Sequence, residues 1–452
     1  MPSETLVPQQ KRFSRQMLRK LIVPLIIEQF LAMAVGMADT VMVTSAGEAA
    51  VSGISLVDSI NILLIQIFSA LATGGAVVVS QYLGRQEHKN ARTAAKQLIY
   101  TSTLLSLILM ALALFFQKGI LQLVFGSIDA DVMENALTYF WLSAISYPFL
   151  AIYNSIAALY RSMGNSTVSM LTSLLMNVVN IGGNAILIFG CGWGVAGAAT
   201  ASLVSRALAA GVMLVLIRNH DNMIYVDGLL HFEYKPQMVK SIMKVGIPNG
   251  LENGMFQTGK LMVQGLIALF GTSAIAANAI VNSVTSVINV PGLAIGLAMI
   301  TVIGQCVGAD AYDQAVYYTR RLMGLIYAAM AAMNLIIFAL AYPLVGMFNL
   351  SPEATTLAIQ ILQIFCVVNA LLWPIAFPFA NVLRAAGDAK FTMVASVISM
   401  WIFRIGFSYI LAQGFNMGLQ GVWYAMYIDW AVRAIIFWIR YKSGRWKTKR
   451  VI

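Results

Sequence analysis

Residues 54–80 read ISLVDSINILLIQIFSALATGGAVVVS, a stretch in which Asp58 is the only charged residue. An α-helix needs roughly 20 mostly apolar residues to cross a lipid bilayer, so this stretch is long enough to do so. Its apolar run is continuous, whereas the strands of a membrane β-barrel alternate apolar and polar residues over about 10 positions. The stretch therefore predicts a transmembrane helix.

Similar apolar runs occupy most of the chain and are separated by short polar or glycine-containing stretches. The twelve predicted spans are 21–44, 54–80, 97–117, 136–160, 167–190, 195–217, 245–270, 274–305, 322–345, 357–382, 391–412 and 418–439. Of 452 residues, 59% are hydrophobic and 10% are charged, and the mean hydropathy is +0.78. A water-soluble protein of this length could not expose such a composition to solvent. We therefore expect an all-α integral membrane protein without a cleavable signal peptide.

The formal net charge of +11 indicates membrane topology rather than binding to nucleic acid, because basic residues gather in every second connection. The connections around Gly47, Gly192, Gly271, Asn349 and Gly414 contain no Lys or Arg. The basic segments are Lys11 to Lys20, residues 84–96, Arg161, Arg218 to Lys244, Arg320 and Arg321, Arg384 to Lys390, and Arg440 to Arg450. By the positive-inside rule, both termini are cytoplasmic in a plasma membrane, which we expect to be a bacterial inner membrane.

The sequence repeats itself at an offset of about 224 residues. The matching landmarks are Pro24 to Glu28 with Pro248 to Glu252, GEAAVSG (47–53) with GTSAIAA (271–277), VVSQYLG (78–84) with VIGQCVG (302–308), YRSMGN (160–165) with LRAAGD (383–388), and GVAGAATA (194–201) with GLQGVWYA (418–425). Each copy holds six spans, so both copies enter the membrane from the same side. We expect two six-helix lobes related by a pseudo-twofold axis along the membrane normal.

The repeat divides the chain into five parts. They are a cytoplasmic N-terminal segment (1–20), an N-lobe (21–217), a cytoplasmic linker (218–241), a C-lobe (242–440) and a basic cytoplasmic tail (441–452). Transporters built from parallel repeats hold their substrate between the lobes and expose it to either side of the membrane in turn. The polar linker suits a hinge between the lobes.

Ionisable residues inside the predicted spans are candidates for function, because each costs roughly 2.5–3.5 kcal/mol at the bilayer centre on insertion scales. The acids are Glu28, Asp39, Asp58, Glu252 and Asp429, and the bases are Arg206, Lys260, Arg404 and Arg433. Glu28 and Glu252 occupy equivalent repeat positions, four residues after Pro24 and Pro248, whose missing N–H groups loosen the helix. We expect Glu28, Pro24 and Pro248 to line the substrate cavity or to act in gating, and Glu252 to take part in ion coupling.

Other polar residues of the spans have a structural interpretation beside the functional one. Asp429 and Arg433 are four residues apart and predict an ion pair on one helix face. Arg206 and Arg404 receive the same interpretation, and the role of Lys260 stays open. Asn180, Asn184 and Ser202 could bridge helices, or their oxygens could bind a small cation or a protonated carboxylate. Cys191, Cys306 and Cys366 show no metal spacing and are interpreted as packing residues.

Together the landmarks resemble the multidrug and toxic compound extrusion (MATE) family. The residues that carry the resemblance are Pro24 with GMADTVMV (36–43), GEAAVSG (47–53), SQYLG (80–84), YRSMGN (160–165), NAILIFG (184–190), GVAGAATAS (194–202), Pro248 with Glu252, and LRAAGD (383–388). They cover nearly the whole chain, from about residue 15 to 440. The resemblance implies an antiporter that exports organic, typically cationic, compounds while sodium ions or protons flow inward. We expect it to act as a monomer on amphipathic or cationic small molecules and to need no cofactor.

The resemblance also assigns residues. Asp39 sits where the family has a carboxylate on its first helix, and Asn180 and Ser202 match its Asn and Thr, so a proton or a sodium ion would bind at Asp39, Asn180, Asn184 and Ser202. Asn184 departs from the family, many of whose members have Asp there. Glu252 matches the acid on helix 7 of the sodium-coupled branch, but Trp373 replaces that branch's acid on helix 10.

Three alternatives remain at this stage: a flippase, a membrane-embedded enzyme and a channel, of which the channel suits tandem lobes less well than alternating access does. A flippase for a lipid-linked or amphipathic substrate has the same fold, but it should have an excess of arginine in its cavity, whereas acids and bases are nearly balanced here. An enzyme would need a catalytic cluster, and neither HExxH nor GxSxG with partners occurs. The lobes differ in chemistry, because in the repeat register Asp39 corresponds to Val263, and Asn180 and Asn184 correspond to Arg404 and Ser408.

Overall fold

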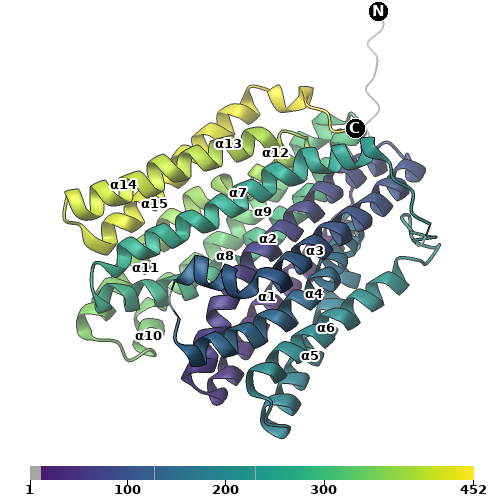
Figure 1. Ribbon diagram of the computed structural model, residues 1–452. Coiled ribbons are helices and arrows are strands. Elements are labelled where there is room, and N and C mark those ends of the chain that lie inside the picture. The colour runs from purple at the N-terminus through teal and green to yellow at the C-terminus, as the bar shows by residue number, and fades with distance from the viewer. Residues whose placement is uncertain (1–11, 127, 230) are drawn as a thin grey trace, which may run out of the picture.

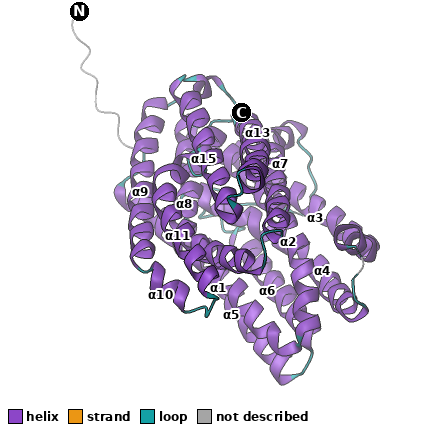
Figure 2. Ribbon diagram, turned by 90° about the vertical axis from the view of Figure 1, so that its left-hand side faces the viewer, coloured by secondary structure: helices purple, strands orange, loops and turns teal. Residues whose placement is uncertain are grey.

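The computed structural model describes residues 12–126, 128–229 and 231–452, and the described residues form helices and connections without a strand (Figures 1 and 2). The N-lobe contains α1 (Arg15–Val43), α2 (Glu48–Gly84), α3 (His88–Phe125), α4 (Ala130–Ser162), α5 (Ser166–Asn184) with a π-helical end (Ala185–Gly190), and α6 (Gly194–Leu216). The C-lobe contains α7 (Pro236–Ala268), α8 (Thr272–Gly308), α9 (Tyr312–Ala339), the short α10 (Ala341–Gly346), α11 (Pro352–Ala376), α12 (Ala380–Ala385), α13 (Ala389–Ser399), α14 (Phe407–Tyr409) and α15 (Gly418–Lys442). The π-helical segment Met400–Gly406 joins α13 to α14, and a second one, Ile410–Gly414, continues α14, so that residues 389–414 form one long helix.

Eleven helices in the described parts of the chain are long and apolar enough to cross a membrane. Large apolar side chains such as Phe115 and Leu123 are exposed on the outside of the bundle, where lipid would cover them. The other long helix is α7, which has a polar stripe at Asn249, Asn253, Gln257, Lys260 and Gln264. It packs against α2 and α13, so the prediction of twelve long helices agrees with the structure.

The helix ends differ from the predicted boundaries where polar residues continue a helix beyond its apolar run. Helix α7 begins at Pro236, so the last residues of the predicted linker 218–241 are helical, and proline favours the first turn of a helix. The connection before α7 is bound to α3, since Tyr100 donates its hydroxyl to Leu229 O (3.0 Å) and Lys235 N donates to Gln97 Oε1 (3.1 Å). The connection is therefore fastened to the N-lobe.

The two ends of the chain are also tied into the fold. Of the predicted N-terminal segment 1–20, residues 1–11 lie outside the described residues, and Arg15 to Lys20 belong to α1. The tail 441–452 packs against the start of α7, where Ser241 donates its hydroxyl to Val451 O (2.9 Å). Its Trp446 is buried. The C-terminal end and the connection before α7 lie at the same end of the bundle in Figure 1, which we call the basic end.

Each lobe has its own apolar core, and each core includes the first turns of a helix from the other lobe. Leu18, Leu21 and Leu25 of α1 are buried in the core of the C-lobe. Ile242 and Val245 of α7 are buried in the core of the N-lobe. The lobes therefore interlock at the basic end.

Helices α2 and α8 cross at the basic end with their backbones almost in contact. A Cβ atom on Gly84 would lie 2.1 Å from Gln305 O, and one on Gly308 would lie 2.0 Å from Gln81 O. The two glutamines bind across the lobes in the same way, since Gln81 Nε2 donates to Ala385 O (2.8 Å) and Gln305 Nε2 donates to Ser162 O (2.8 Å). This symmetric pair of contacts closes the basic end of the space between the lobes.

We expect Gly84→Ala to separate the lobes at the basic end, because its Cβ would overlap a backbone oxygen that no side-chain rotation can move. The measurement is the distance between spin labels on exposed Lys89 and Asp313, in a variant whose three native cysteines are replaced. The distance distribution should shift to longer values. Gly324→Ala, where a Cβ would meet nothing within 4 Å, is the matched control, and an unchanged distribution in Gly84→Ala would contradict the close-crossing account.

Candidate functional site

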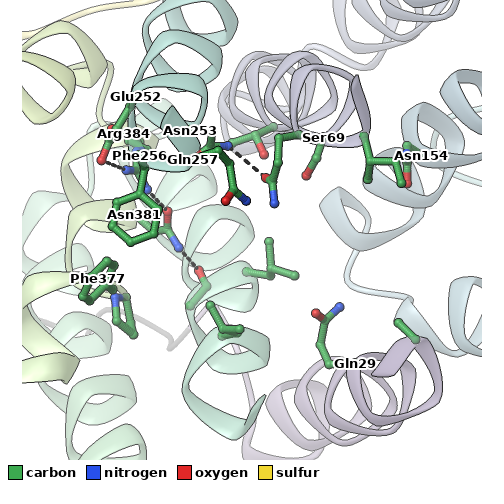
Figure 3. Close-up of a pocket in the computed structure, with 18 of the residues that line it drawn as sticks. Gln29, Ser69, Asn154, Glu252, Asn253, Phe256, Gln257, Phe377, Asn381 and Arg384 are labelled. Atoms are coloured by element: carbon green, nitrogen blue, oxygen red, sulfur yellow. Dashed lines mark hydrogen bonds and ion pairs between the residues drawn. The ribbon is translucent and has the colours of Figure 1, made fainter. Parts of the chain in front are cut away.

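A cavity of about 580 Å³ lies between the two lobes. Helices α1, α2, α4 and α5 of the N-lobe and α7, α8, α11, α12, α13 and α15 of the C-lobe contribute side chains to its wall. Figure 3 shows Glu252, Phe256 and Asn381 from the C-lobe across from Gln29, Ser69 and Asn154 from the N-lobe. The volume and the mixed polar and apolar lining fit a small organic molecule.

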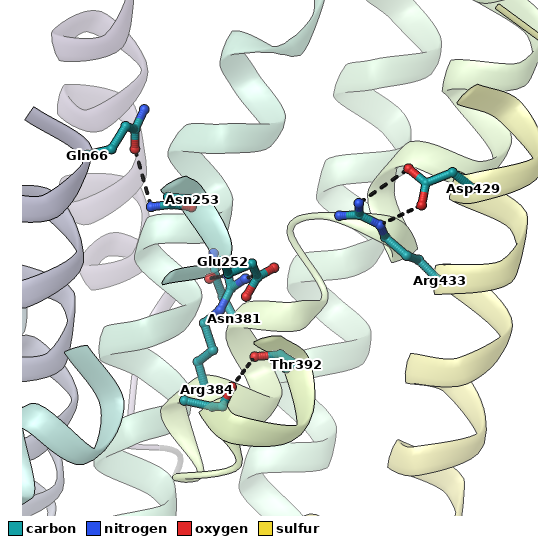
Figure 4. Close-up of polar contacts among 9 residues, drawn as sticks. Gln66, Glu252, Asn253, Asn381, Arg384, Thr392, Asp429 and Arg433 are labelled. Carbon is teal, nitrogen blue, oxygen red and sulfur yellow. Dashed lines mark hydrogen bonds and ion pairs between the residues drawn. The ribbon is translucent and has the colours of Figure 1, made fainter. Parts of the chain in front are cut away.

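Two buried ion pairs face this cavity, one in each lobe. In the N-lobe, Arg161 Nη1 lies 3.2 Å from Glu28 Oε1, and Ser169 donates its hydroxyl to Glu28 Oε2 at 2.7 Å. In the C-lobe, Arg384 Nη2 lies 2.7 Å from Glu252 Oε1 (Figure 4). The four side chains are between 8% and 16% exposed. Glu28 and Glu252 therefore have equivalent partners in equivalent places.

Each ion pair adjoins one of the contacts that close the basic end. Gln305 binds the carbonyl of Ser162, which directly follows Arg161, and Gln81 binds the carbonyl of Ala385, which directly follows Arg384. Thr301 of α8 also donates its hydroxyl to Arg161 O at 3.0 Å. A movement of either arginine would therefore reach the contacts between the lobes through the backbone.

The sequence did not single out Arg161 and Arg384 as site residues, because basic residues near helix ends were interpreted as signs of topology. The signal was present, since the two arginines hold the same place in YRSMGN and LRAAGD. Glu28 and Glu252, which each follow a proline, match in the same repeat register. Two acids and two bases repeated together predict a repeated ion pair.

The four residues predicted to hold a coupling ion lie together in the N-lobe. Asn184 Nδ2 donates to Asp39 Oδ1 at 2.6 Å and approaches Asn180 Oδ1 at 3.4 Å. Asn180 Nδ2 donates to Ser202 Oγ at 3.1 Å. A chain of hydrogen bonds thus joins α1, α5 and α6. Asn184 Oδ1 is buried and has no hydrogen-bond partner among the described residues.

Two further charges surround Asp39. Arg206 attracts the Asp39 carboxylate electrostatically, and Asp58 of α2 repels it. Arg206 Nη1 also donates to Ser146 Oγ at 2.7 Å. Asn61 Nδ2 donates to Asp58 Oδ1 at 3.2 Å. The N-lobe group of Asp39, Asp58 and Arg206 carries a formal net charge of about −1 when every member is ionised.

The structure keeps the predicted site residues in two separate places. The Asp39 chain is not among the residues that line the cavity, whereas Glu28 and Glu252 are. Trp373, at the position of the missing acid on the predicted helix 10, is buried and stacks on Phe377 with ring centroids 5.6 Å apart. Glu252 therefore pairs with an arginine and has no second carboxylate beside it.

The predicted prolines lie inside continuous helices. Pro24 is within α1 and Pro248 is within α7. Proline leaves the carbonyl four residues earlier without its helical partner, which for Pro24 is the carbonyl of Lys20. The hydroxyl of Ser166 lies 3.3 Å from Lys20 O and also approaches Leu21 O. Helix α5 thus supports α1 where its own hydrogen bonding is weakened.

In the C-lobe, the predicted pair on α15 is present as a bidentate contact. Arg433 Nε lies 3.1 Å from Asp429 Oδ1 and Arg433 Nη2 lies 3.3 Å from Asp429 Oδ2 (Figure 4). Both side chains are almost fully buried.

Comparison with known proteins identifies the family to which this chain belongs. The family model described as MatE matches residues 24–186 and again residues 248–410. The chain belongs to the MatE family. Both ends of the second match follow those of the first by the same interval (248 − 24 and 410 − 186, both 224), which confirms the repeat that the sequence predicted. The expected resemblance to the multidrug and toxic compound extrusion (MATE) family is thereby confirmed.

Relatives of this MATE protein match it over nearly their whole length. It is 29% identical to the protein named "Uncharacterized transporter YisQ" of Bacillus subtilis (strain 168), over 98% of this chain and 96% of that one. It is 26% identical to the "Probable multidrug resistance protein NorM" of Thermotoga maritima, over 97% and 94%. The solved structure described as an outward-facing multidrug resistance MATE transporter has a TM-score of 0.89 at 19% identity, over 98% of this chain and 100% of that one.

These matches establish the class of the protein. It is a multi-pass membrane transporter of the multidrug efflux family, with two lobes, and not an enzyme.

Proposed function

We propose that this MATE transporter is an antiporter that exports amphipathic organic cations in exchange for protons. The observation that carries the proposal is the hydrogen-bonded chain from Asp39 through Asn184 and Asn180 to Ser202, which lies apart from the residues that line the cavity. A carboxylate inside a membrane protein can bind a cation or a proton, and such residues mark ion pathways. The transported compound would move when the lobes open alternately to the two sides.

The surroundings of Asp39 favour a proton over a sodium ion. Hard cations bind several oxygen ligands, and the hydrogen-bond chain offers a single carboxylate, with the Asn184 amide directing its nitrogen at it. The unpartnered Asn184 Oδ1 provides for the protonated form, because a turned amide would present this oxygen to the carboxyl O–H. The site can therefore accommodate Asp39 in both protonation states.

The two cavity ion pairs suggest how substrate would act on the lobes. A cationic substrate between the lobes would meet Glu28 and Glu252 and compete with Arg161 and Arg384 for them. Weakening either pair frees the arginine whose neighbouring carbonyl binds a glutamine of the opposite lobe. Glu28 and Glu252 are thus proposed as gating residues, and Pro24 and Pro248 as the positions at which α1 and α7 bend.

The placement of basic residues supports a protein of the plasma membrane, in a bacterium the inner membrane, with both termini in the cytoplasm. We propose that it acts as a monomer. In that orientation the structure is closed on the cytoplasmic side. A flippase of an anionic lipid is not favoured, because each of the three arginines that line the cavity is paired with an acid: Arg161 with Glu28, Arg384 with Glu252 and Arg433 with Asp429. The relatives named multidrug resistance proteins also favour drug export.

The test is uptake of the cationic dye rhodamine 6G into everted vesicles that contain the transporter. Proton and sodium gradients are imposed separately, and vesicles without the protein give the background. We expect uptake when the vesicle interior is acidic and no uptake with a sodium gradient alone. Uptake driven by sodium with the proton gradient collapsed would overturn the proposed coupling ion, and uptake by neither gradient would overturn antiport.

A further inference from the structure

The C-lobe holds a group of cations at the place where the N-lobe holds its acids. In the repeat register, Arg404 corresponds to Asn180, Val263 to Asp39, Asn282 to Asp58 and Lys260 to Gly36. Lys260, Arg404 and Arg433 supply three positive charges. Asp429, which pairs with Arg433 and attracts Arg404, supplies one negative charge, so the formal net charge is about +2 against about −1 in the N-lobe. Two lobes with one scaffold therefore present opposite charges.

Asp429 attracts Arg404 electrostatically, but its direct contacts are with other residues. It accepts both N–H contacts from Arg433 and the hydroxyl of Ser399 at 2.6 Å. Arg404 forms no salt bridge among the described residues, and its Nε is buried without a hydrogen-bond partner. A guanidinium in a membrane span needs a partner, so a negative group from outside the chain would complete the site.

Aromatic rings place these cations beside the cavity. The guanidinium carbon of Arg404 lies 5.3 Å from the centroid of the Phe256 ring, and that of Arg433 lies 5.7 Å from the same centroid. Phe256 and Arg433 both line the cavity. Lys260 follows Phe256 by one helical turn on the same face of α7, is exposed, and repels Arg404 electrostatically.

We propose that Lys260, Arg404 and Phe256 form a subsite for an oxyanion group, a carboxylate or its like, on an aromatic amphipathic substrate. The planar guanidinium matches a carboxylate in a two-point contact, Lys260 adds a point charge, and the Phe256 face packs against the ring system. The transporter then accepts zwitterions, with the anionic group in the C-lobe and the cationic group toward Glu28 of the N-lobe. This inference rests on the proposed export function and specifies its substrate class.

The test compares two dyes that differ only at this group. Rhodamine 6G is a cationic ester, and rhodamine 19 is its free acid and therefore a zwitterion. Binding to the purified full-length protein in detergent is followed by fluorescence anisotropy. We expect Arg404→Gln and Lys260→Gln each to raise the dissociation constant of rhodamine 19 by roughly tenfold or more, because each change removes a charge-assisted hydrogen bond. The constant for rhodamine 6G should change by less than about twofold, as for a distant charge.

Controls separate the subsite from general damage to the fold. Lys118→Gln removes an exposed cation on α3 and should change neither dye. Arg404→Lys keeps the charge and should recover part of the rhodamine 19 binding. An equal loss of both dyes in Arg404→Gln, or an unchanged ratio of their dissociation constants, would overturn the subsite.

A lipid phosphate has the same chemistry as the proposed ligand. Binding of phosphatidylglycerol in mixed micelles is therefore measured as well. If Arg404→Gln alters lipid binding and leaves the ratio of the two dyes' dissociation constants unchanged, the occupant is lipid and the substrate proposal fails. Failure of the export function would appear differently, as the absence of rhodamine 6G uptake by wild-type vesicles.

Discussion

Asp39→Asn is expected to reduce proton-driven dye uptake in everted vesicles to the level of vesicles without the protein. Asparagine has nearly the shape of aspartate and can still bind Asn184, which contacts Asp39 at 2.6 Å in the native chain. It cannot gain or lose a proton, so the site would keep one charge state throughout the cycle. Binding and folding should survive while coupling is lost.

The matched control for this variant is Glu48→Gln, which removes the same charge at the exposed first turn of α2. Its uptake should equal that of the wild type. Equal rhodamine 6G binding by both variants in detergent would show that the loss in Asp39→Asn concerns coupling alone. A wild-type rate of proton-driven uptake in Asp39→Asn would refute the role of Asp39.

Arg384→Gln is expected to destabilise the protein strongly, because it leaves the Glu252 carboxylate buried without its cation. Removing one partner of a buried ion pair costs about 3–5 kcal/mol. The apparent melting temperature of the purified protein in detergent, read from tryptophan fluorescence, should fall markedly. Because the pair also adjoins the contact from Gln81 to Ala385 O, dye transport should be lost as well.

The double variant Glu252→Gln with Arg384→Gln distinguishes charge from packing. It removes both charges together, so most of the thermal stability should return while transport stays low. Arg450→Gln breaks an exposed pair in which Arg450 Nη2 lies 3.9 Å from Asp310 Oδ1, and should change stability by less than about 1 kcal/mol. If Arg384→Gln melted like the wild type, the ion pair would have no part in holding the cavity wall.

The sequence allowed prediction of the helices and the repeat because both depend on local or regularly spaced signals. Long apolar runs mark the spans, and collinear motifs mark the two copies. Helix ends were less predictable, since polar turns such as Pro236 to Ser241 extend a helix without changing the apolar pattern. The attachment of Leu229 and Lys235 to α3 depends on long-range contacts that no local pattern contains.

The candidate site was predictable in part. Asp39, Asn180, Asn184 and Ser202 could be grouped through the family resemblance, and the structure places them in one hydrogen-bonded chain. The partners of Glu28 and Glu252 could not be found from spacing along a single helix, because Arg161 and Arg384 come from other helices.

The opposite charges of the two lobes become apparent when equivalent positions are compared together with their neighbours in space, which only the structure gives. In the sequence, Arg404 was interpreted as a structural residue, since a nearby acid in space could have neutralised it. The structure shows that Asp429 makes its direct contacts with Arg433 and Ser399, whereas Arg404 forms no salt bridge among the described residues. The symmetric scaffold therefore carries an acidic N-lobe and a basic C-lobe, and coupling by the N-lobe becomes the central claim.

Proton release on substrate binding tests that claim most directly. Rhodamine 6G is added to purified protein in weakly buffered detergent solution, at a pH where Asp39 is protonated before substrate binds, and the pH change is recorded. If substrate and proton compete through Asp39, the wild type should release up to about one proton for each dye bound and Asp39→Asn should release none. Equal proton release by the two proteins would contradict coupling at the N-lobe.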